Sequence, residues 1–205
     1  MAEMPHAPVL RYDLRAIAQQ IAAEKTDSEV LDIGCGNGAL MAALESTGCA
    51  MVRGIEIDAD LVAQCVGQGL SVVQGDANSD LVDYPDDSFD FVVLSQTLQT
   101  TNRPDLVVEQ LLRVGRKAFV SFPNFAHWRT RAALLFKGRM PMTRTLPVSW
   151  YETPNIHHVT VEDFRALVAE KGARIEQRWF FSDGEVISTA GANWRAEIAL
   201  FEITR

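Results

Sequence analysis

One short stretch constrains the fold of this chain more than any other. Residues 30–38 read Val-Leu-Asp-Ile-Gly-Cys-Gly-Asn-Gly, an apolar run followed by three alternating glycines. A helical pattern begins directly afterwards, over residues 39–44, so the glycines join a buried strand to a helix. Such a turn lets a ligand approach the main chain closely, and the N–H groups of the helix N-terminus attract an anion. The stretch therefore predicts an α/β protein with a ligand site at this turn.

The same alternation of strand and helix continues along the chain. Further strands are predicted at residues 51–57, 71–73, 89–94 and 118–122, and further helices at residues 10–21, 60–66, 104–112 and 160–172. This alternation is typical of a parallel sheet with helices on both faces. Residues 174–181 and 194–203 then read as two strands with no helix between them, which predicts an antiparallel pair. We expect a doubly wound, mostly parallel seven-stranded sheet with an antiparallel edge hairpin.

Length and composition narrow the class of protein further. The 205 residues suit a single domain, residues 1–205, although residues 138–159 contain three prolines and no clear period. We interpret that segment as a lid or docking element.

No apolar run reaches the roughly 18 to 20 residues of a membrane span. A net charge of −8 disfavours nucleic acid and membrane surfaces as partners. The three cysteines show no CxxC spacing, and the chain has only four histidines, so the sequence predicts no metal site. We expect a cytoplasmic protein.

Acidic residues at three successive strand ends predict the ligand of the glycine turn. Asp32 would repel a pyrophosphate by about 1 to 4 kcal/mol but would attract an ammonium group. Glu56 can accept hydrogen bonds from both ribose hydroxyls, and Asp76 can accept one from an adenine amino group. Each acid alone could be a strand-end cap or a turn residue, and dinucleotide sites use the related GxGxxG. All three together favour S-adenosylmethionine or its demethylated product, S-adenosylhomocysteine. The predicted cofactor-binding residues are Asp32, Gly34, Cys35, Gly36, Glu56, Ile57, Asp76, Ala77, Ser95 and Gln96.

A resemblance to known proteins supports this interpretation. Residues 28–123 resemble the class I S-adenosylmethionine-dependent methyltransferases. The runs VLDIGCGNG, LSQTLQTTNRPDLVVEQLLRVGRKAFVSFPNFAHWRTR and GRMPMT…LPVSWYETPNIH look like the MetW family of methionine-biosynthesis proteins. The resemblance implies a Rossmann-like class I methyltransferase fold. It also implies a methyltransferase-like protein that is a partner of homoserine O-acyltransferase, the enzyme that activates homoserine toward methionine.

The sequence does not identify a catalytic centre. After the fourth predicted strand, amino-methylating enzymes of this fold carry an Asn/Asp-Pro-Pro-Tyr-type motif, whereas this chain has Ser95-Gln96-Thr97-Leu98-Gln99. Ser95 or Gln96 could bind the cofactor's amino acid end or a substrate, or could form a polar turn. Cys35 could be a thiol nucleophile or a small buried filler. His127 and His158 could be bases, but neither has an obvious acidic partner.

One basic segment stands out from the acidic background. Residues 126–145 contain five lysines and arginines and no acidic residue. Such a run can be a solvated helix face, but with its aromatic residues and methionines it also fits a protein-docking surface, and fits nucleic acid less well. The predicted partner-binding residues are Arg129, Arg131 and Arg139. Two functions remain: a cofactor-binding regulatory subunit of the acyltransferase, or an active methyltransferase of an unidentified small molecule.

Overall fold

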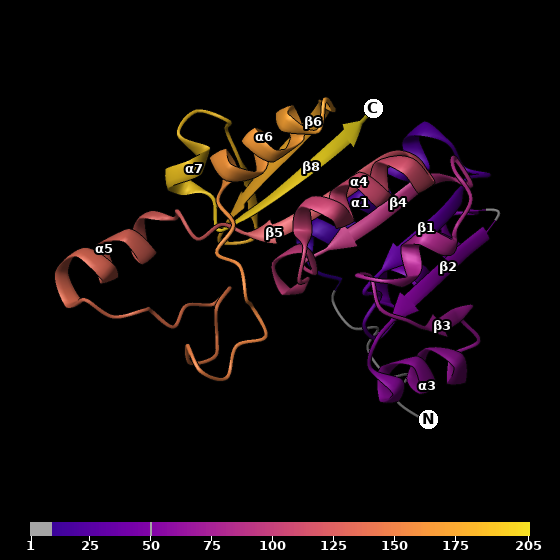
Figure 1. The fold of residues 1–205 in the computed structure, drawn as a ribbon, viewed down its shortest axis with the longest axis horizontal. Helices are drawn as coiled ribbons and strands as arrows, with labels where there is room; N and C mark the ends of the chain where they lie inside the picture. Colours follow the sequence, from indigo (N-terminus) through magenta and orange to yellow (C-terminus); the bar gives the residue numbers. More distant parts are fainter. Residues whose placement is uncertain (1–9, 50) are drawn as a thin grey trace, which may run out of the picture.

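A mixed sheet of eight strands forms the centre of the molecule (Figure 1). The computed structural model describes residues 10–49 and 51–205. The strands are β1 (Glu29–Ile33), β2 (Met51–Glu56), β3 (Val72–Gln74), β4 (Phe89–Ser95), β5 (Gly115–Pro123), β6 (Arg174–Ser182), β7 (Glu185–Ile187) and β8 (Ile198–Thr204). The helices are α1 (Tyr12–Glu24), α2 (Ala39–Ser46), α3 (Ala59–Gly67), α4 (Pro104–Val114), α5 (Trp128–Lys137), α6 (Val161–Glu170) and α7 (Ala192–Arg195), with 3-10 turns η1 (Asp80–Asp83) and η2 (Leu98–Thr100).

The strand order is β3-β2-β1-β4-β5-β8-β6-β7. The first five strands are parallel, and β8 pairs antiparallel with both β5 and β6. The predicted doubly wound sheet and its antiparallel edge are therefore confirmed. The predicted count of seven strands is wrong, because β7 adds an eighth strand by pairing with β6. Asp183 and Gly184 join them, both with positive φ, which is the geometry of a tight hairpin turn.

The second predicted strand of the hairpin begins too early in the sequence. Trp194 lies in the short helix α7, and β8 starts only at Ile198. Gly191, with a φ of +67°, precedes α7 and turns the chain into it. Tryptophan suits strands by propensity, but here the local turn chemistry decides the conformation.

Helices cover both faces of the sheet, because strand side chains alternate between them. Along β4, Val92 and Leu94 pack with α4 and α6, whereas Phe91 and Val93 pack with α1 and α2. The central parallel strands β1 and β4 are thus buried on both sides, as their continuous apolar runs predict, whereas β3 at the edge of the sheet is not. This arrangement leaves the carboxyl ends of β1, β2 and β4 side by side at one edge of the sheet.

Helix α5 departs from the layered body, and Figure 1 shows it projecting beyond the sheet. No regular helical pattern predicts it, and Thr130 is its one buried residue. The chain then runs through residues 138–159 without helix or strand. It is tied back to the body near its end, where the N–H groups of Ile156 and His157 donate to the carbonyl of Gln99 at 3.0 Å each.

Within residues 10–49 and 51–205, no helix of the chain combines the length and apolar character of a membrane span. The His, Cys, Asp and Glu side chains of these residues form no group of three placed to hold a metal ion.

Candidate functional site

The three glycines after β1 have positive φ and serve different purposes. A Cβ on Gly34 would lie 2.4 Å from the hydroxyl of Thr97, and one on Gly38 would lie 2.3 Å from Leu70, so both glycines are required by packing. A Cβ on Gly36 would meet no heavy atom within 4 Å. The backbone of Gly36 therefore faces open space at the carboxyl edge of the sheet, where a ligand can approach it.

Glu56 links the second strand to this turn. Its Oε2 accepts a hydrogen bond from the N–H of Gly36 at 2.8 Å, and its Oε1 accepts from Ile57 at 2.8 Å and Asp58 at 3.1 Å. A carboxylate has about four acceptor positions, so one remains at Oε2. The predicted pair of ribose hydrogen bonds therefore requires one of these backbone contacts to lengthen.

Asp32 lies at the level of the turn in the centre of the sheet and is 2% exposed. No hydrogen bond from the described residues reaches its carboxylate. Burial raises the pKa of Asp32 to about 7, with the positive charge of Arg11 opposing this shift and the negative charge of Glu56 adding to it. A buried carboxylate without a donor is costly, and a ligand cation would relieve that cost.

The other predicted residues lie at the rim or behind the turn. Asp76 accepts from the backbone and side chain of Asn78 at 2.8 and 2.7 Å, and Ala77 packs against the core. Ile57 is 64% exposed. Cys35 is buried behind the turn, and burial raises the pKa of its thiol, so it has the properties of a filler rather than a nucleophile.

A buried polar cluster at this edge was not predicted from the sequence. Asp13 of α1 is fully buried, and its Oδ2 accepts hydrogen bonds from Ser95 at 3.0 Å and Ser121 at 2.8 Å. Arg11 binds both oxygens of the same carboxylate, at 2.9 Å each. Burial opposes ionisation, but the hydrogen bonds and charge of Arg11 hold the pKa of Asp13 below its ordinary value. Gln96, with a φ of +53°, lies within 3.5 Å of the cluster.

The sequence carries only a weak signal for this cluster. Asp13 reads as a favourable acidic residue in the first turn of a helix. Its partners Ser95 and Ser121 lie 82 and 108 residues further along the chain. The structure thus brings the predicted residues Ser95, Gln96, Asp32 and Glu56 to one edge and adds Arg11 and Asp13 to them.

The histidines considered as bases lie elsewhere. His127 is buried before α5, and burial lowers its pKa. His158 packs edge-on against Phe125 with ring centroids 4.7 Å apart. Both belong to the projecting part of the molecule rather than to the glycine turn.

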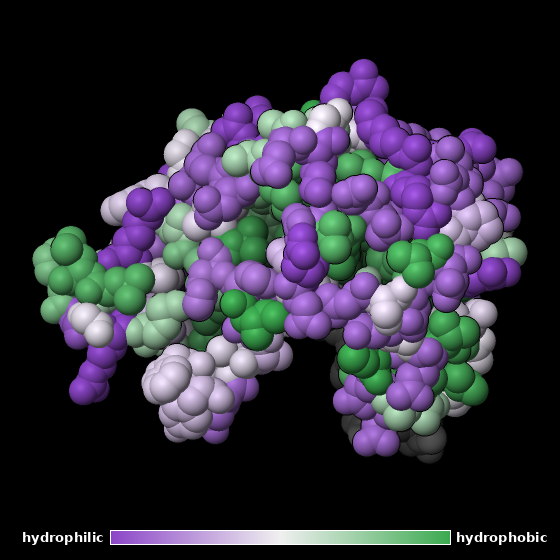
Figure 2. Space-filling view, in the orientation of Figure 1, coloured by the Kyte–Doolittle hydropathy of each residue, from purple (hydrophilic) through white to green (hydrophobic). Residues whose placement is uncertain are grey.

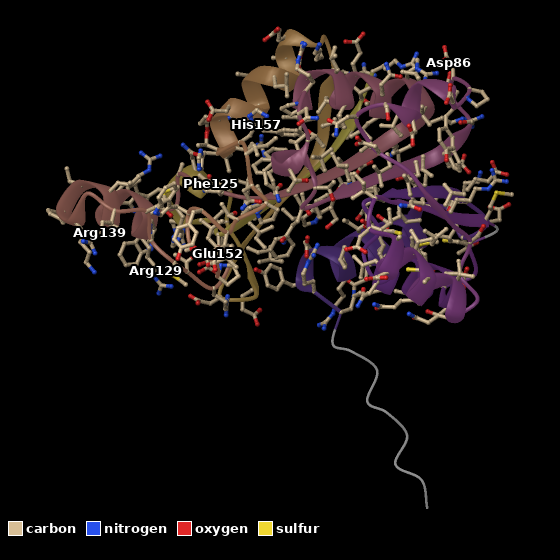
Figure 3. All side chains as sticks on the ribbon, turned by 60° about the horizontal axis from the view of Figure 1, so that its bottom comes forward. Asp86, Phe125, Arg129, Arg139, Glu152 and His157 are labelled. Carbon is tan, nitrogen blue, oxygen red and sulfur yellow. The ribbon has the colours of Figure 1, made fainter. Side chains whose placement is uncertain are left out.

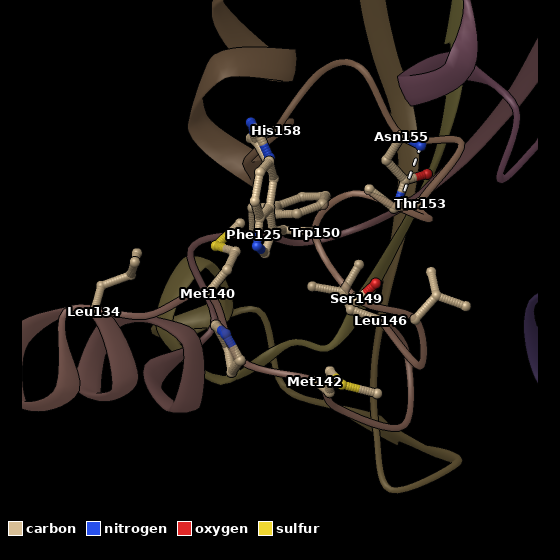
Figure 4. A pocket seen from close by; sticks show the side chains of 12 residues that line it. Phe125, Leu134, Met140, Met142, Leu146, Ser149, Trp150, Thr153, Asn155 and His158 are labelled. Carbon is tan, nitrogen blue, oxygen red and sulfur yellow. Dashed lines mark hydrogen bonds between the residues drawn. The ribbon is translucent and has the colours of Figure 1, made fainter.

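That projecting part contains an apolar hollow of about 470 Å³ (Figure 4). Its walls come from α5 and from the irregular segment that follows it. The labelled side chains of Phe125, Leu134, Met140, Met142 and Trp150 surround it. Trp150 in its wall is 76% exposed, and Leu135 and Phe136 of α5 are 77% and 81% exposed. Figure 2 shows apolar side chains gathered over the end of α5. We call α5 together with residues 138–158 the α5 extension.

The three predicted partner-binding arginines all lie on the α5 extension. Figure 3 shows Arg139 toward the outer end of α5 and Arg129 nearer the body of the molecule. Arg129 stacks on Trp128, with 5.3 Å from its Cζ to the ring centroid, and lies 3.6 Å from the buried Glu197. Arg131 stacks on Trp194 and donates to the carbonyl of Ala126 at 2.6 Å. Arg139 makes no ion pair with the described residues.

Comparison with protein families identifies the chain. The family model described as "Methionine biosynthesis protein MetW" matches residues 11–203. The chain belongs to the MetW family. It is also 33% identical over 187 residues to the "Bifunctional methionine biosynthesis protein MetXA/MetW" of Rhodopirellula baltica. That match covers 87% of this chain and 30% of the relative, so the chain spans about a third of the length of the curated relative.

Solved structures with the same fold include S-adenosylmethionine-dependent methyltransferases. An Archaeoglobus fulgidus enzyme superposes with a TM-score of 0.68 at 16% identity, covering 94% of both chains. A Mesorhizobium loti enzyme gives 0.67 at 20% identity, covering 94% of this chain and 98% of that one. The magnesium protoporphyrin IX methyltransferase of Synechocystis, solved with S-adenosylhomocysteine bound, gives 0.68 at 16% identity, with 94% and 81% coverage. These likenesses confirm the methyltransferase fold expected for a MetW protein.

Proposed function

We propose that this MetW protein binds S-adenosylmethionine or S-adenosylhomocysteine at the carboxyl edge of its sheet. The observation that supports this most directly is the open Gly36 backbone between Glu56 and the buried Asp32. Asp32 would receive the ammonium group, Glu56 a ribose hydroxyl and Asp76 the adenine amino group. When bound, S-adenosylmethionine would supply a methyl group on a sulfonium.

Calorimetric titration tests the cofactor assignment. S-adenosylhomocysteine should bind the full chain, and NAD, which carries a pyrophosphate, should bind much more weakly because of Asp32. If NAD bound more tightly than S-adenosylhomocysteine, the assignment would be wrong.

We further propose that the protein is a regulatory subunit of homoserine O-acyltransferase rather than an independent enzyme. The R. baltica relative is a bifunctional MetXA/MetW protein, so a MetW part is joined to a second methionine-biosynthesis part in that polypeptide. The resemblance to the MetW family implies homoserine O-acyltransferase as the partner. In the described part of this chain, the glycine-turn site has the polar stretch Ser95–Gln96 in place of a proline-containing acidic motif.

The α5 extension supports the partner proposal physically. Helix α5 has ten residues and one buried side chain. Isolated helices shorter than about 12 to 15 residues are marginal in water, and exposed apolar patches usually mark interfaces. Leu135, Phe136 and Trp150 would then form the apolar centre of the interface, and Arg129, Arg131 and Arg139 its basic rim.

Co-purification with the acyltransferase, with and without S-adenosylhomocysteine, tests the partnership. Phe136→Ser should weaken the complex, whereas Val186→Ser, at a position on β7 that is 62% exposed, should not. Steady conversion of S-adenosylmethionine to S-adenosylhomocysteine with a cell metabolite would instead favour the active methyltransferase.

A further inference from the structure

Among the described residues, Arg11, just before α1, is the cation whose charge acts on Asp32. Its Nη2 donates to the hydroxyl of Ser95 at 2.5 Å. In the sheet, Ile33 of β1 pairs with Leu94 of β4, so the next residues, Gly34 and Ser95, lie side by side. The guanidinium of Arg11 is therefore one strand away from the glycine turn.

Arg11 is held in a fixed orientation. Its Nε and Nη2 bind the two oxygens of Asp13 in a bidentate pair, and Asp13 is in turn fixed by Ser95 and Ser121. Bidentate pairing fixes the plane of a guanidinium. Within the described residues, Nη1 makes no hydrogen bond, and the side chain is 44% exposed. Two N–H groups of a pre-oriented cation therefore remain for a ligand.

The charges around this position match an amino acid zwitterion. Asp32 is a buried acid without a donor from the described residues. Arg11 is a cation with unused donors, and it lies beside Ser95 at the end of the neighbouring strand β4. An α-ammonium group at Asp32 places the attached α-carboxylate only about two bonds away, within reach of a neighbouring cation. Opposite charges arranged in this way would select a ligand that carries both groups.

We propose that Arg11, clamped by Asp13, binds the α-carboxylate of the cofactor's amino acid end, while Asp32 binds its ammonium group. The inference rests on the proposed cofactor and goes beyond it, because it assigns a ligand group to a residue outside the glycine turn. It makes the site selective for the intact amino acid over a decarboxylated analogue.

A matched pair of ligands tests the assignment. S-adenosylmethionine and decarboxylated S-adenosylmethionine both keep the sulfonium, the ammonium group and the adenosine, and differ only in the carboxylate. Arg11→Gln should weaken S-adenosylmethionine about ten- to a hundredfold and leave the decarboxylated compound nearly unchanged. Asp32→Asn should weaken both compounds. Arg15→Gln, one helical turn further along α1 and exposed, is the control and should weaken neither.

The outcomes separate this inference from the proposed function. Because Arg11→Gln also removes the partner of buried Asp13, thermal unfolding of each variant is measured, and Arg11→Lys, which keeps the cation, should recover part of the selectivity. An unchanged ratio of the two affinities, whether both ligands weaken equally or neither weakens, would overturn the role of Arg11 alone. If the wild-type chain bound neither compound, the proposed cofactor would fall, and this assignment with it.

Discussion

At the scale of single residues, the site contains a carboxylate that is unfavourable for the ligand-free fold. Burial raises the pKa of Asp32 from its ordinary value of 3.8 to about 7. Between these two values the folded chain keeps a proton that the unfolded chain has lost, so the contribution of Asp32 to stability decreases as the pH rises through this window. A buried residue whose ionised form destabilises the folded chain is typical of a functional site.

We therefore expect Asp32→Asn to stabilise the ligand-free protein by about 1 to 3 kcal/mol at pH 8 and to have little effect near pH 4. Urea unfolding at the two pH values measures this difference. Asp27→Asn, at an exposed position, is the matched control and should change little at either pH. If Asp32→Asn instead destabilised the protein at pH 8, the carboxylate would already have a stabilising contact in the ligand-free fold.

The same ionisation should control ligand binding. A ligand ammonium group pairs with the charged form of Asp32, so the affinity for S-adenosylmethionine should decrease by up to about tenfold per pH unit below pH 7. Calorimetry in buffers of different ionisation enthalpy would then detect proton release on binding at pH 6. Binding that is independent of pH between 5.5 and 8 would contradict the pairing.

Glu56 gives a second prediction at this scale. Glu56→Ala removes acceptors for a ribose hydroxyl and for the Gly36 N–H, and should weaken S-adenosylhomocysteine by about 1 to 3 kcal/mol in calorimetry. Gly36→Val should prevent binding, because its side chain fills the open space and its φ of +58° is unfavourable for a branched residue. Normal affinity in both variants would exclude this edge as the site.

The sequence predicts these residues because their signal is local. Asp32, Gly36 and Glu56 stand at fixed positions relative to strand ends, so the pattern of strands alone brings them together. The clamp of Arg11 and Asp13 depends on contacts with residues more than 80 positions away, and no local pattern records such contacts. Tertiary packing alone places these two residues at the site.

At the scale of elements, strands β1, β4 and β5 and helix α4 are predictable because they are buried and strongly patterned. Strand β7 is not predictable in the same way, because it has three residues and only the turn signal Asp183-Gly184 precedes it. Helix α5 escapes prediction because its apolar residues lie on more than one face and none of them is buried. An element that buries none of its apolar side chains has no amphipathic pattern to detect.

The α5 extension should be the first part of the free protein to be cut by proteases. Few backbone hydrogen bonds hold residues 138–155 apart from the turns at Thr143–Leu146 and Ser149–Thr153. Limited proteolysis followed by mass spectrometry should locate the first cuts there, and the bound acyltransferase should slow them. First cuts within the strands, with this segment intact, would mean that it is packed more firmly than its contacts indicate.

At the scale of the whole molecule, one chain of contacts joins the carboxyl edge of the sheet, where the cofactor is proposed to bind, to the α5 extension. Gln99 of η2 is buried, and its Nε2 donates to the carbonyl of Gln96 at 2.6 Å. Its own carbonyl accepts from Ile156 and His157 at 3.0 Å each. A ligand that shifts Gln96 would therefore shift residues 156–157, and with them the preceding part of the α5 extension, which includes Trp150 of the proposed partner surface.

This connection predicts that cofactor and partner binding are coupled, and the coupling must be reciprocal. Titrating S-adenosylhomocysteine into the protein with and without the acyltransferase should give affinities that differ by about 5- to 150-fold, or about 1 to 3 kcal/mol. Gln99→Leu, which keeps the volume but removes the side-chain hydrogen bond to Gln96, should reduce that factor while each partner still binds alone. Gln110→Leu on α4 is the control, because its side chain bonds only Arg113 among the described residues. Equal affinities in the wild-type protein would leave the MetW chain as a passive scaffold, whereas coupling unaffected by Gln99→Leu would mean that it travels by another route.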